Sequence, residues 1–107
     1  MPVKWEIWLV NMPYEEGIGS KIRPALVIDP QHSFVLVGKM TSHSPRSSCP
    51  YEYQIIDWKK ANLNRPTTLR LSKCVKLELS AFVQKVGVLQ PIDQVNVRGI
   101  LKLINSL

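Results

Sequence analysis

Up to about residue 90, the chain consists of short apolar runs separated by proline, glycine and polar residues. The runs are rich in β-branched and aromatic residues, which favour extended structure. Seven of the eight prolines and four of the five glycines lie in this part of the chain and punctuate these runs. This pattern predicts several short strands joined by tight connections. The expected strands are residues 6–10, 24–28, 33–40, 51–56, 67–71 with a continuation at 75–77, and 85–88.

The end of the chain has a helical pattern instead. Four apolar residues there are spaced i, i+3, i+4 and i+7: Val97, Ile100, Leu101 and Ile104. This spacing places them on one face of a helix. Pro91 and Asp93 suit its first turn. Shorter helical segments are expected at 57–62, with Asp57 as N-cap, and at 79–83.

The order of these elements limits the fold class. The 107 residues contain no repeat, low-complexity tract or long linker, so residues 1–107 are expected to form a single domain. Short strands followed by one helix favour a mainly β fold, a small SH3-like barrel with a C-terminal α-helix. A chain of this size has little room for an enclosed pocket, so a site is expected in a surface groove or at a subunit interface.

Basic residues are concentrated in the middle of the chain. The net charge is +6, and residues 31–80 carry eight basic and three acidic side chains. Such a surface attracts polyphosphates, although charge alone is equally compatible with a basic protein that has no such ligand.

Sequence motifs give no sign of a cofactor or of a membrane segment. Cys49 and Cys74 form no CxxC motif and have no histidine at metal-ligand spacing, so no metal is expected. No nucleotide-binding loop is visible. No apolar run is long enough for a signal peptide or a membrane span, so we expect a cytoplasmic protein with no membrane partner.

Two groups of residues follow or precede apolar strands and could contact a phosphate. Arg23 ends a glycine-bearing loop, and Pro24 after it favours extended backbone. The planar guanidinium of arginine matches phosphate oxygens. Lys39, Thr41 and Ser42 lie where the third strand becomes a loop, and they could supply charge and hydroxyl donors. The competing interpretations are an ordinary surface arginine and ordinary turn residues.

Two further groups carry charge or a titratable side chain. His43 begins a polar loop that also contains Arg46, and an imidazole is suited to proton transfer. Arg70 and Ser72 belong to a basic stretch between residues 59 and 73. The competing interpretation of both groups is a solvated surface.

Taken together, these segments resemble the MazF/PemK family of toxins from type II toxin–antitoxin systems. The resemblance covers nearly the whole chain and rests on two segments in order, Arg23–Val27 after a glycine-bearing loop and Thr41-Ser42 after a valine-rich strand. Similar segments also occur at 7–10, 58–63, 67–71 and 85–89.

The resemblance implies a fold, an activity and partners. It implies an SH3-like barrel of the MazF/CcdB type that forms a homodimer. It also implies a sequence-specific, metal-independent endoribonuclease that cuts single-stranded messenger RNA, leaving 2′,3′-cyclic phosphate and 5′-hydroxyl ends. A cognate antitoxin would cover the RNA groove with an acidic segment. The loop at 14–22 is expected to be exposed and to lie over that groove.

The resemblance also assigns roles to residues. It places the family's catalytic arginine and threonine on Arg23 and Thr41, and His43 is our candidate for proton transfer. The residues expected to bind substrate are Lys39, Ser42, Arg46, Arg70 and Ser72.

Two departures from the family pattern leave alternatives open. Part of the family has Arg-x-Asp in the later strand, whereas Ser72 stands two residues after Arg70 here and cannot act as a carboxylate base. Lys39 stands where many members have proline. The alternatives are a catalytically inactive nucleic-acid-binding relative and a CcdB-like toxin directed at gyrase. The Arg23 and Thr41 pair argues against the second, since a gyrase binder needs no phosphate site.

Overall fold

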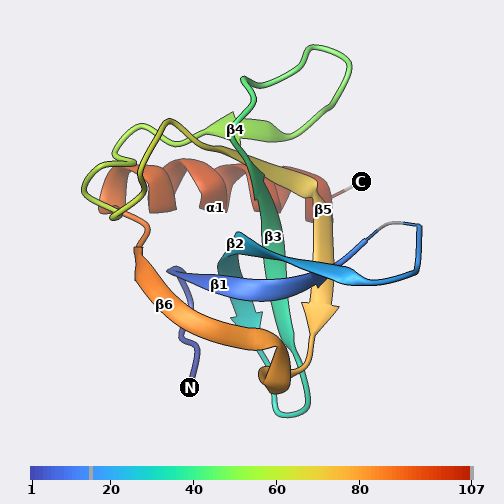
Figure 1. Ribbon diagram of the computed structural model, residues 1–107. Helices are drawn as coiled ribbons and strands as arrows, with labels where there is room; N and C mark the ends of the chain where they lie inside the picture. The colour runs from blue at the N-terminus through green and yellow to red at the C-terminus, as the bar shows by residue number, and fades with distance from the viewer. Residues whose placement is uncertain (15, 107) are drawn as a thin grey trace.

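A computed structural model of the protein describes residues 1–14 and 16–106. These residues form six strands and one α-helix (Figure 1). The strands are β1 (Glu6–Pro13), β2 (Ser20–Pro30), β3 (Val35–Thr41), β4 (Glu52–Gln54), β5 (Thr68–Leu77) and β6 (Phe82–Val88). Helix α1 covers Pro91–Asn105, and a 3-10 turn, η1, covers Leu79–Ala81. The mainly β fold with a C-terminal helix is therefore confirmed.

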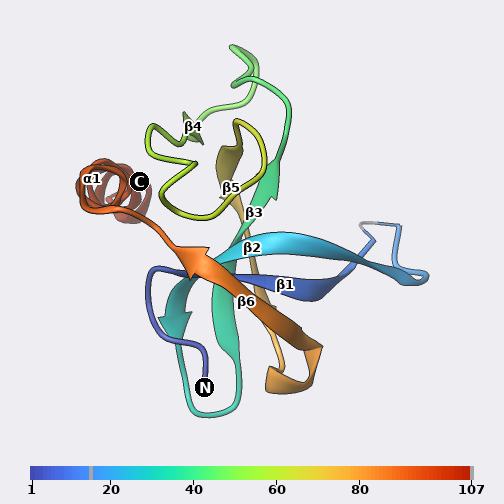
Figure 2. The same ribbon diagram turned by 60° about the vertical axis from the view of Figure 1, so that its left-hand side comes forward.

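The strands form one antiparallel sheet in the order β4-β5-β3-β2-β1-β6. Among the described residues no ladder joins the edge strands β4 and β6, so the barrel is open. The sheet is bent, and the segment between β4 and β5 lies beside β6 (Figure 2). There the side-chain amide of Asn62 donates to the Val86 carbonyl at 2.7 Å. Ala61 and Gly87 approach so closely that a Cβ on Gly87 would lie 2.1 Å from the Ala61 oxygen. We call these four residues the seam.

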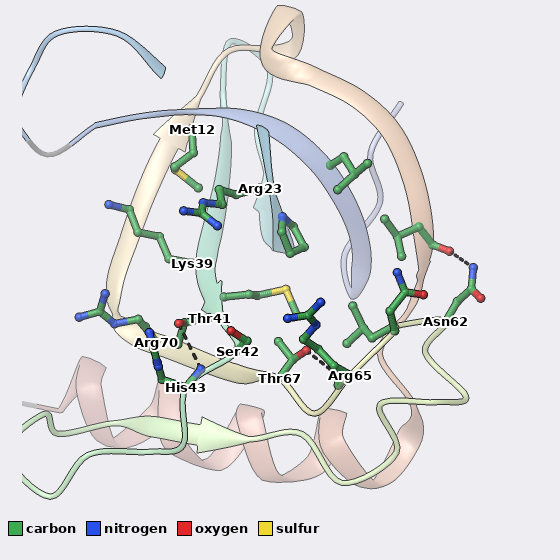
Figure 3. A pocket seen from close by; sticks show the side chains of 16 residues that line it. Met12, Arg23, Lys39, Thr41, Ser42, His43, Asn62, Arg65, Thr67 and Arg70 are labelled. Carbon is green, nitrogen blue, oxygen red and sulfur yellow. Dashed lines mark hydrogen bonds between the residues drawn. The ribbon is translucent and has the colours of Figure 1, made fainter. Parts of the chain in front are cut away.

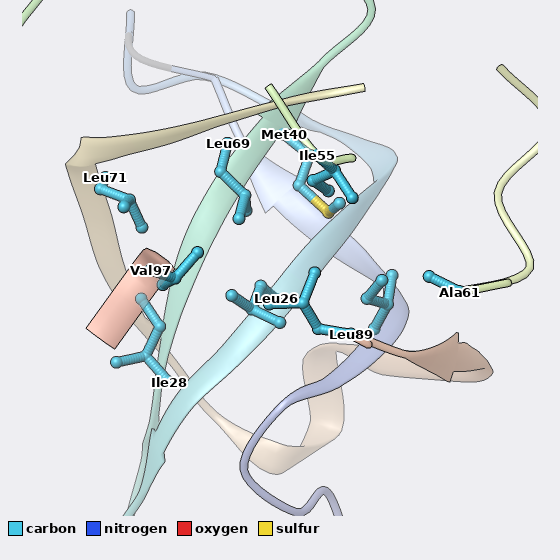
Figure 4. Packing of buried hydrophobic residues seen from close by; sticks show 10 residues of the cluster. Leu26, Ile28, Met40, Ile55, Ala61, Leu69, Leu71, Leu89 and Val97 are labelled. Carbon is cyan, nitrogen blue, oxygen red and sulfur yellow. The ribbon is translucent and has the colours of Figure 1, made fainter. Parts of the chain in front are cut away.

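Both faces of the central strands are buried. Alternate residues of a strand point to opposite faces, so the apolar runs of the sequence supply two cores. On one face Leu26 and Met40 pack with Ile55, Leu69 and Val97, the last from α1 (Figure 4). The opposite face buries a second cluster: Val10, Met12, Ala25, Val27, Val35, Val37 and Leu77.

Helix α1 begins with Pro91 at its first turn, as predicted, and buries Val97. Asp93 in this turn is fully buried, which the sequence did not indicate. Its carboxylate accepts hydrogen bonds from the Tyr53 hydroxyl and from the backbone N–H groups of Ile56 (2.8 Å) and Asp57 (2.9 Å). Asp93 therefore fixes the start of the segment that leads to the seam. No helix in the described part of the chain is long and apolar enough to cross a bilayer.

Replacing Tyr53 with phenylalanine is expected to change how stability depends on pH. Burial, followed by the hydrogen bond to Asp93, raises the pKa of Tyr53 from 10.0 to about 12. The folded state therefore holds the phenol proton more tightly than the unfolded state. Its contribution to the free energy of unfolding is complete below pH 10 and is lost as the pH rises to 12.

Urea unfolding of the wild type and of Tyr53→Phe between pH 10 and pH 12 measures this effect. We expect the variant to be less stable at neutral pH by about 1.5–3 kcal/mol, because a hydrogen bond to a charged group is lost. The difference between the two proteins should shrink as the pH rises. A difference that stays constant across this range would contradict the role of the phenol proton.

The first hairpin is longer than predicted. Residues 11–13 were expected to end the first strand, yet they pair with β2 in the register Asn11↔Ile22, Met12↔Lys21 and Pro13↔Ser20. The expected loop at 14–22 therefore shrinks to residues 14–19, of which Glu15 lies outside the described residues. Cross-strand pairing prevails over the local turn signals here. The hairpin projects away from the sheet (Figure 2).

Other boundaries were also wrong. The helix expected at 79–83 is only the turn η1, because Phe82 pairs with Val10 and its ring contacts Trp8 at a centroid distance of 5.8 Å. The helix expected at 57–62 is a series of turns with a single helical bond, from the Ala61 N–H to the Asp57 carbonyl. The strand expected at 51–56 is limited to β4, and that expected at 33–40 is shifted to β3.

Candidate functional site

A groove of about 680 Å³ opens at one end of the sheet (Figure 3). Its lining comes from β1, β2, β3, β5 and β6, from the start of the loop after β3 and from the segment 62–67. The residues that line it are Leu9, Met12, Arg23, Pro24, Lys39, Met40, Thr41, Ser42, His43, Asn62, Leu63, Asn64, Arg65, Thr67, Arg70 and Val86.

Strand alternation brings the polar groups of the groove together. Ala25 of β2 pairs with Lys39 of β3. Arg23 precedes Ala25 by two residues and Thr41 follows Lys39 by two, so both lie on the face of the sheet that carries Ala25 and Lys39. Lys39 in turn pairs with Arg70 of β5. On the same face, the residues deeper in the molecule are apolar and form the buried cluster around Val27 and Val37. The groove is thus the polar end of a buried face.

The loop after β3 is held by hydrogen bonds to its backbone. The Thr68 hydroxyl donates to the His43 carbonyl at 2.6 Å. The His43 N–H donates to the Thr41 hydroxyl oxygen at 3.4 Å, which leaves the Thr41 proton able to donate elsewhere. Ser42 and His43 are exposed and line the groove.

The groove is strongly cationic. It is lined by Arg23, Lys39, Arg65 and Arg70, and no aspartate or glutamate is among its lining residues in the described chain. Within residues 1–14 and 16–106, no carboxylate pairs with Arg23. Figure 3 shows Arg23 and Arg65 on opposite sides of the groove. A guanidinium without an acidic partner retains all its donors for an anion.

Arg70 differs from Arg23 because it has an acidic partner behind it. Its Nε lies 3.1 Å from Oε2 of Glu52, whose side chain is only 2% exposed. The other oxygen of Glu52 accepts the Arg46 N–H at 2.9 Å. The Arg46 N–H and the Arg70 guanidinium lower the pKa of Glu52, so it remains ionised. Nothing in the sequence distinguished Glu52 from a surface acid.

The structure brings together six of the eight site residues expected from the sequence. Arg46 and Ser72 are not among the groove-lining residues. Arg46 lies further along the loop and is exposed. On β5, Arg70 pairs with Lys39 but Cys74 pairs with Gly38, so residues 71–73 bulge out of the ladder to β3 and leave Ser72 exposed. The loop at 14–22 was also expected to cover the groove, and none of its described residues lines it.

The wall formed by residues 62–67 was missed by sequence reasoning. Asn62, Asn64 and Thr67 line the groove, yet nothing in their spacing separated them from ordinary loop residues. Asn62 and Thr67 had been noted only within segments similar to the family, and Arg65 only as part of the basic stretch. Asn62 has a left-handed φ of 69°, a conformation that asparagine tolerates. The positions of these residues depend on the seam and on Asp93, which are long-range contacts.

Within the described chain, no three His, Cys, Asp or Glu side chains are grouped so that they could hold a metal ion. The residues that line the groove offer hydrogen-bond donors, fixed positive charge and an imidazole.

Comparison with known proteins shows the family to which the chain belongs. Residues 4–104 match the family model of the PemK-like, MazF-like toxins of type II toxin–antitoxin systems. The chain belongs to this family. A search of curated proteins found no match. Among solved structures, the fold is similar to that of the Mycobacterium tuberculosis toxin MazF-mt6, with a TM-score of 0.68 at 13% identity, covering 94% of this chain and 97% of that one.

The family resemblance noted in the sequence is thus confirmed, as is the expected MazF-like fold. Membership of the PemK-like, MazF-like family makes the chain a toxin of the type II class, whose members are paired with an antitoxin protein. At 13% identity, the likeness to MazF-mt6 shows the fold alone.

Proposed function

We propose that this PemK-like, MazF-like chain is a metal-independent endoribonuclease that cleaves single-stranded messenger RNA at specific sequences. The observation that carries the proposal is the groove itself. An arginine without an acidic partner and a threonine hydroxyl line the same cationic groove, whose described lining contains no carboxylate. Such a lining suits a phosphodiester and would repel no part of an RNA backbone.

The reaction would use the RNA's own nucleophile. The ribose 2′-oxygen attacks the adjacent phosphorus, and the bond from phosphorus to the 5′-oxygen breaks. The products are a 2′,3′-cyclic phosphate and a 5′-hydroxyl. Arg23 would stabilise the negative charge that builds on the phosphoryl oxygens, and Thr41 would donate a hydrogen bond to the same phosphate.

Proton transfer needs a group that Arg23 cannot provide, since arginine stays protonated. His43 is the only imidazole among the groove-lining residues. It would take the proton of the 2′-hydroxyl or supply one to the leaving 5′-oxygen. Lys39, Ser42 and Arg70 would bind the substrate, while Arg46 would contact only nucleotides that extend beyond the groove.

Replacing His43 with alanine is expected to slow cleavage by about 10²-fold, the lower end of the range for a lost acid or base. Because the role is proton transfer, the ratio of wild-type to variant rates should depend on pH. Single-turnover rates of both proteins across a pH series provide the measurement. An unchanged rate of His43→Ala at every pH would remove His43 from the mechanism.

The partners form part of the same proposal. The cognate antitoxin would cover the cationic groove with an acidic segment, so added antitoxin should block cleavage. The chain would act in the cytoplasm as a homodimer. Exposed apolar side chains on the outer face of α1, among them Ile92, Val95 and Leu103, support an interface. Sedimentation equilibrium that gives the mass of one chain would contradict the dimer.

The test of the proposal is incubation of the purified protein with a long single-stranded RNA in the presence of EDTA. We expect cleavage at a few defined sites, with 2′,3′-cyclic phosphate and 5′-hydroxyl ends. Cleavage that needs a divalent metal, or that leaves 5′-phosphate ends, would contradict the mechanism.

One observation favours a second candidate, an RNA-binding relative without catalytic activity. The described groove lining offers no carboxylate that could act as a base, and Ser72 lies outside it. This candidate predicts retained RNA binding with no products. A gyrase-directed toxin would instead inhibit supercoiling.

A further inference from the structure

Glu52 is a buried carboxylate that does not line the groove but lies behind one of its arginines. It pairs directly with Arg70 across the β4–β5 ladder. The Glu52 side chain is 2% exposed and that of Arg70 is 22% exposed. A carboxylate with so little exposed surface requires partners for its oxygens, and both oxygens of Glu52 have one. Oε2 faces Nε of Arg70, and Oε1 accepts the Arg46 N–H.

This ion pair determines which donors of Arg70 face the groove. The guanidinium is a planar fork, and Glu52 occupies the Nε edge at 3.1 Å. The N–H groups of the two Nη atoms remain for a ligand. A long arginine side chain otherwise loses considerable rotamer freedom when it binds an anion. Arg70 is held in place before any ligand arrives, so this loss is smaller.

The same carboxylate fixes the loop that carries Ser42 and His43. Its bond to the Arg46 N–H holds the far part of this loop, and the Thr68 hydroxyl holds the near part through the His43 carbonyl. Glu52 therefore sets the position of Arg70 relative to this loop.

We infer that Glu52 is a positioning residue that makes Arg70 a fixed phosphate-binding subsite, separate from the site formed by Arg23 and Thr41. This inference rests on the proposed function, because the phosphate is that of an RNA nucleotide next to the one that is cut. Glu52 itself does not touch the substrate.

For the variant Glu52→Gln, charge alone and loss of positioning predict opposite changes in RNA affinity. Glu52→Gln removes one negative charge close to a polyanion site, so charge alone would tighten RNA binding. The two donors use different oxygens of Glu52, and in glutamine one of these oxygens becomes an NH2 group, which would face the Arg46 N–H or the Arg70 Nε–H as a donor against a donor. If Glu52 positions Arg70, the same substitution weakens binding.

The experiment measures binding of a single-stranded RNA with 2′-O-methyl groups throughout, which cannot be cleaved by its own 2′-oxygen. Affinity is measured against salt for the wild type, Glu52→Gln, Arg70→Ala and the double variant. We expect Glu52→Gln to weaken binding about tenfold, as expected for a lost charge-assisted hydrogen bond. The slope of log affinity against log salt should become shallower by about 0.7, as for one lost phosphate contact. The double variant should bind no more weakly than Arg70→Ala alone.

Glu78→Gln is the matched control, because Glu78 is exposed, precedes η1 and lies outside the groove. It makes the same change in charge and should keep the wild-type slope. If Glu52→Gln does not fold, Arg70→Lys tests the same point with Glu52 intact. Its compact ammonium would pair with Glu52 and lack the free fork, so it should show the same loss of slope.

The inference would be overturned if Glu52→Gln bound the RNA as tightly as the wild type, or more tightly, with the wild-type salt slope. A wild-type salt slope for Arg70→Lys would also overturn it. A wild type that binds the RNA but cuts no ordinary RNA refutes the endoribonuclease alone, and the slopes still decide the role of Glu52. A wild type that binds no RNA overturns both.

Discussion

Replacing Arg23 with alanine is expected to slow RNA cleavage by about 10²- to 10³-fold, the usual effect of removing one donor aimed at developing negative charge. Arg23 has no acidic partner in the described chain, and it lines the same groove as Thr41 of the neighbouring strand. Its contribution should be larger in the transition state than in the ground state, because the phosphoryl oxygens gain charge during attack. Single-turnover cleavage with saturating protein measures the chemical step directly.

Arg98→Ala is the matched control for this variant. Arg98 lies on α1, over the ring of Trp5 at 5.6 Å, and is not among the groove-lining residues. The substitution removes the same side chain and the same charge, and we expect a rate close to that of the wild type. Equal losses in the two variants would show that only the overall charge matters. A rate for Arg23→Ala within about twofold of the wild type would exclude Arg23 from the catalytic site.

Replacing Gly87 with alanine is expected to lower the free energy of unfolding by about 3 kcal/mol, the upper part of the range for overpacking. The added Cβ would lie 2.1 Å from the Ala61 oxygen and 2.9 Å from its carbonyl carbon. These are backbone atoms, so no rotamer change relieves the clash, and either β6 or the segment around Ala61 must shift. Urea unfolding of the wild type and the variant measures the loss.

Gly99→Ala makes the same substitution where nothing lies within 4 Å of the new Cβ. Gly99 lies within α1, and alanine there should raise stability by about 0.5–1 kcal/mol, because glycine is a poor helix former. If Gly87→Ala proved as harmless as Gly99→Ala, the close contact at the seam would be wrong.

The order of the elements followed from the sequence because it depends on local signals. Runs such as residues 24–28 are apolar at every position, which is typical of a strand buried on both faces, and the spacing from Val97 to Ile104 is specific to a helix. Arg23 and Thr41 could be found because each adjoins such a run. Their proximity then follows from antiparallel pairing of two neighbouring strands.

Glu52 and Asp93 could not be identified in the same way. In the sequence nothing marks either acid as buried, and the burial of Glu52 and Asp93 depends on partners 18 and 36–40 residues away, respectively. The bulge at residues 71–73 could not be predicted from the sequence either, because it depends on how β5 pairs with β3. For that reason Ser72 was expected in the site although it lies outside the described groove lining.

The seam links the groove to the stability of the whole barrel. The segment that closes the gap between β4 and β6 continues directly into the wall that carries Asn62, Asn64 and Arg65. A ligand that binds both Arg23 of β2 and this wall would join the interior of the sheet to the segment that bridges its edges, and so would favour the folded state. Conversely, residues of this wall cannot change freely to suit a different ligand, because the same backbone holds the segment against β6.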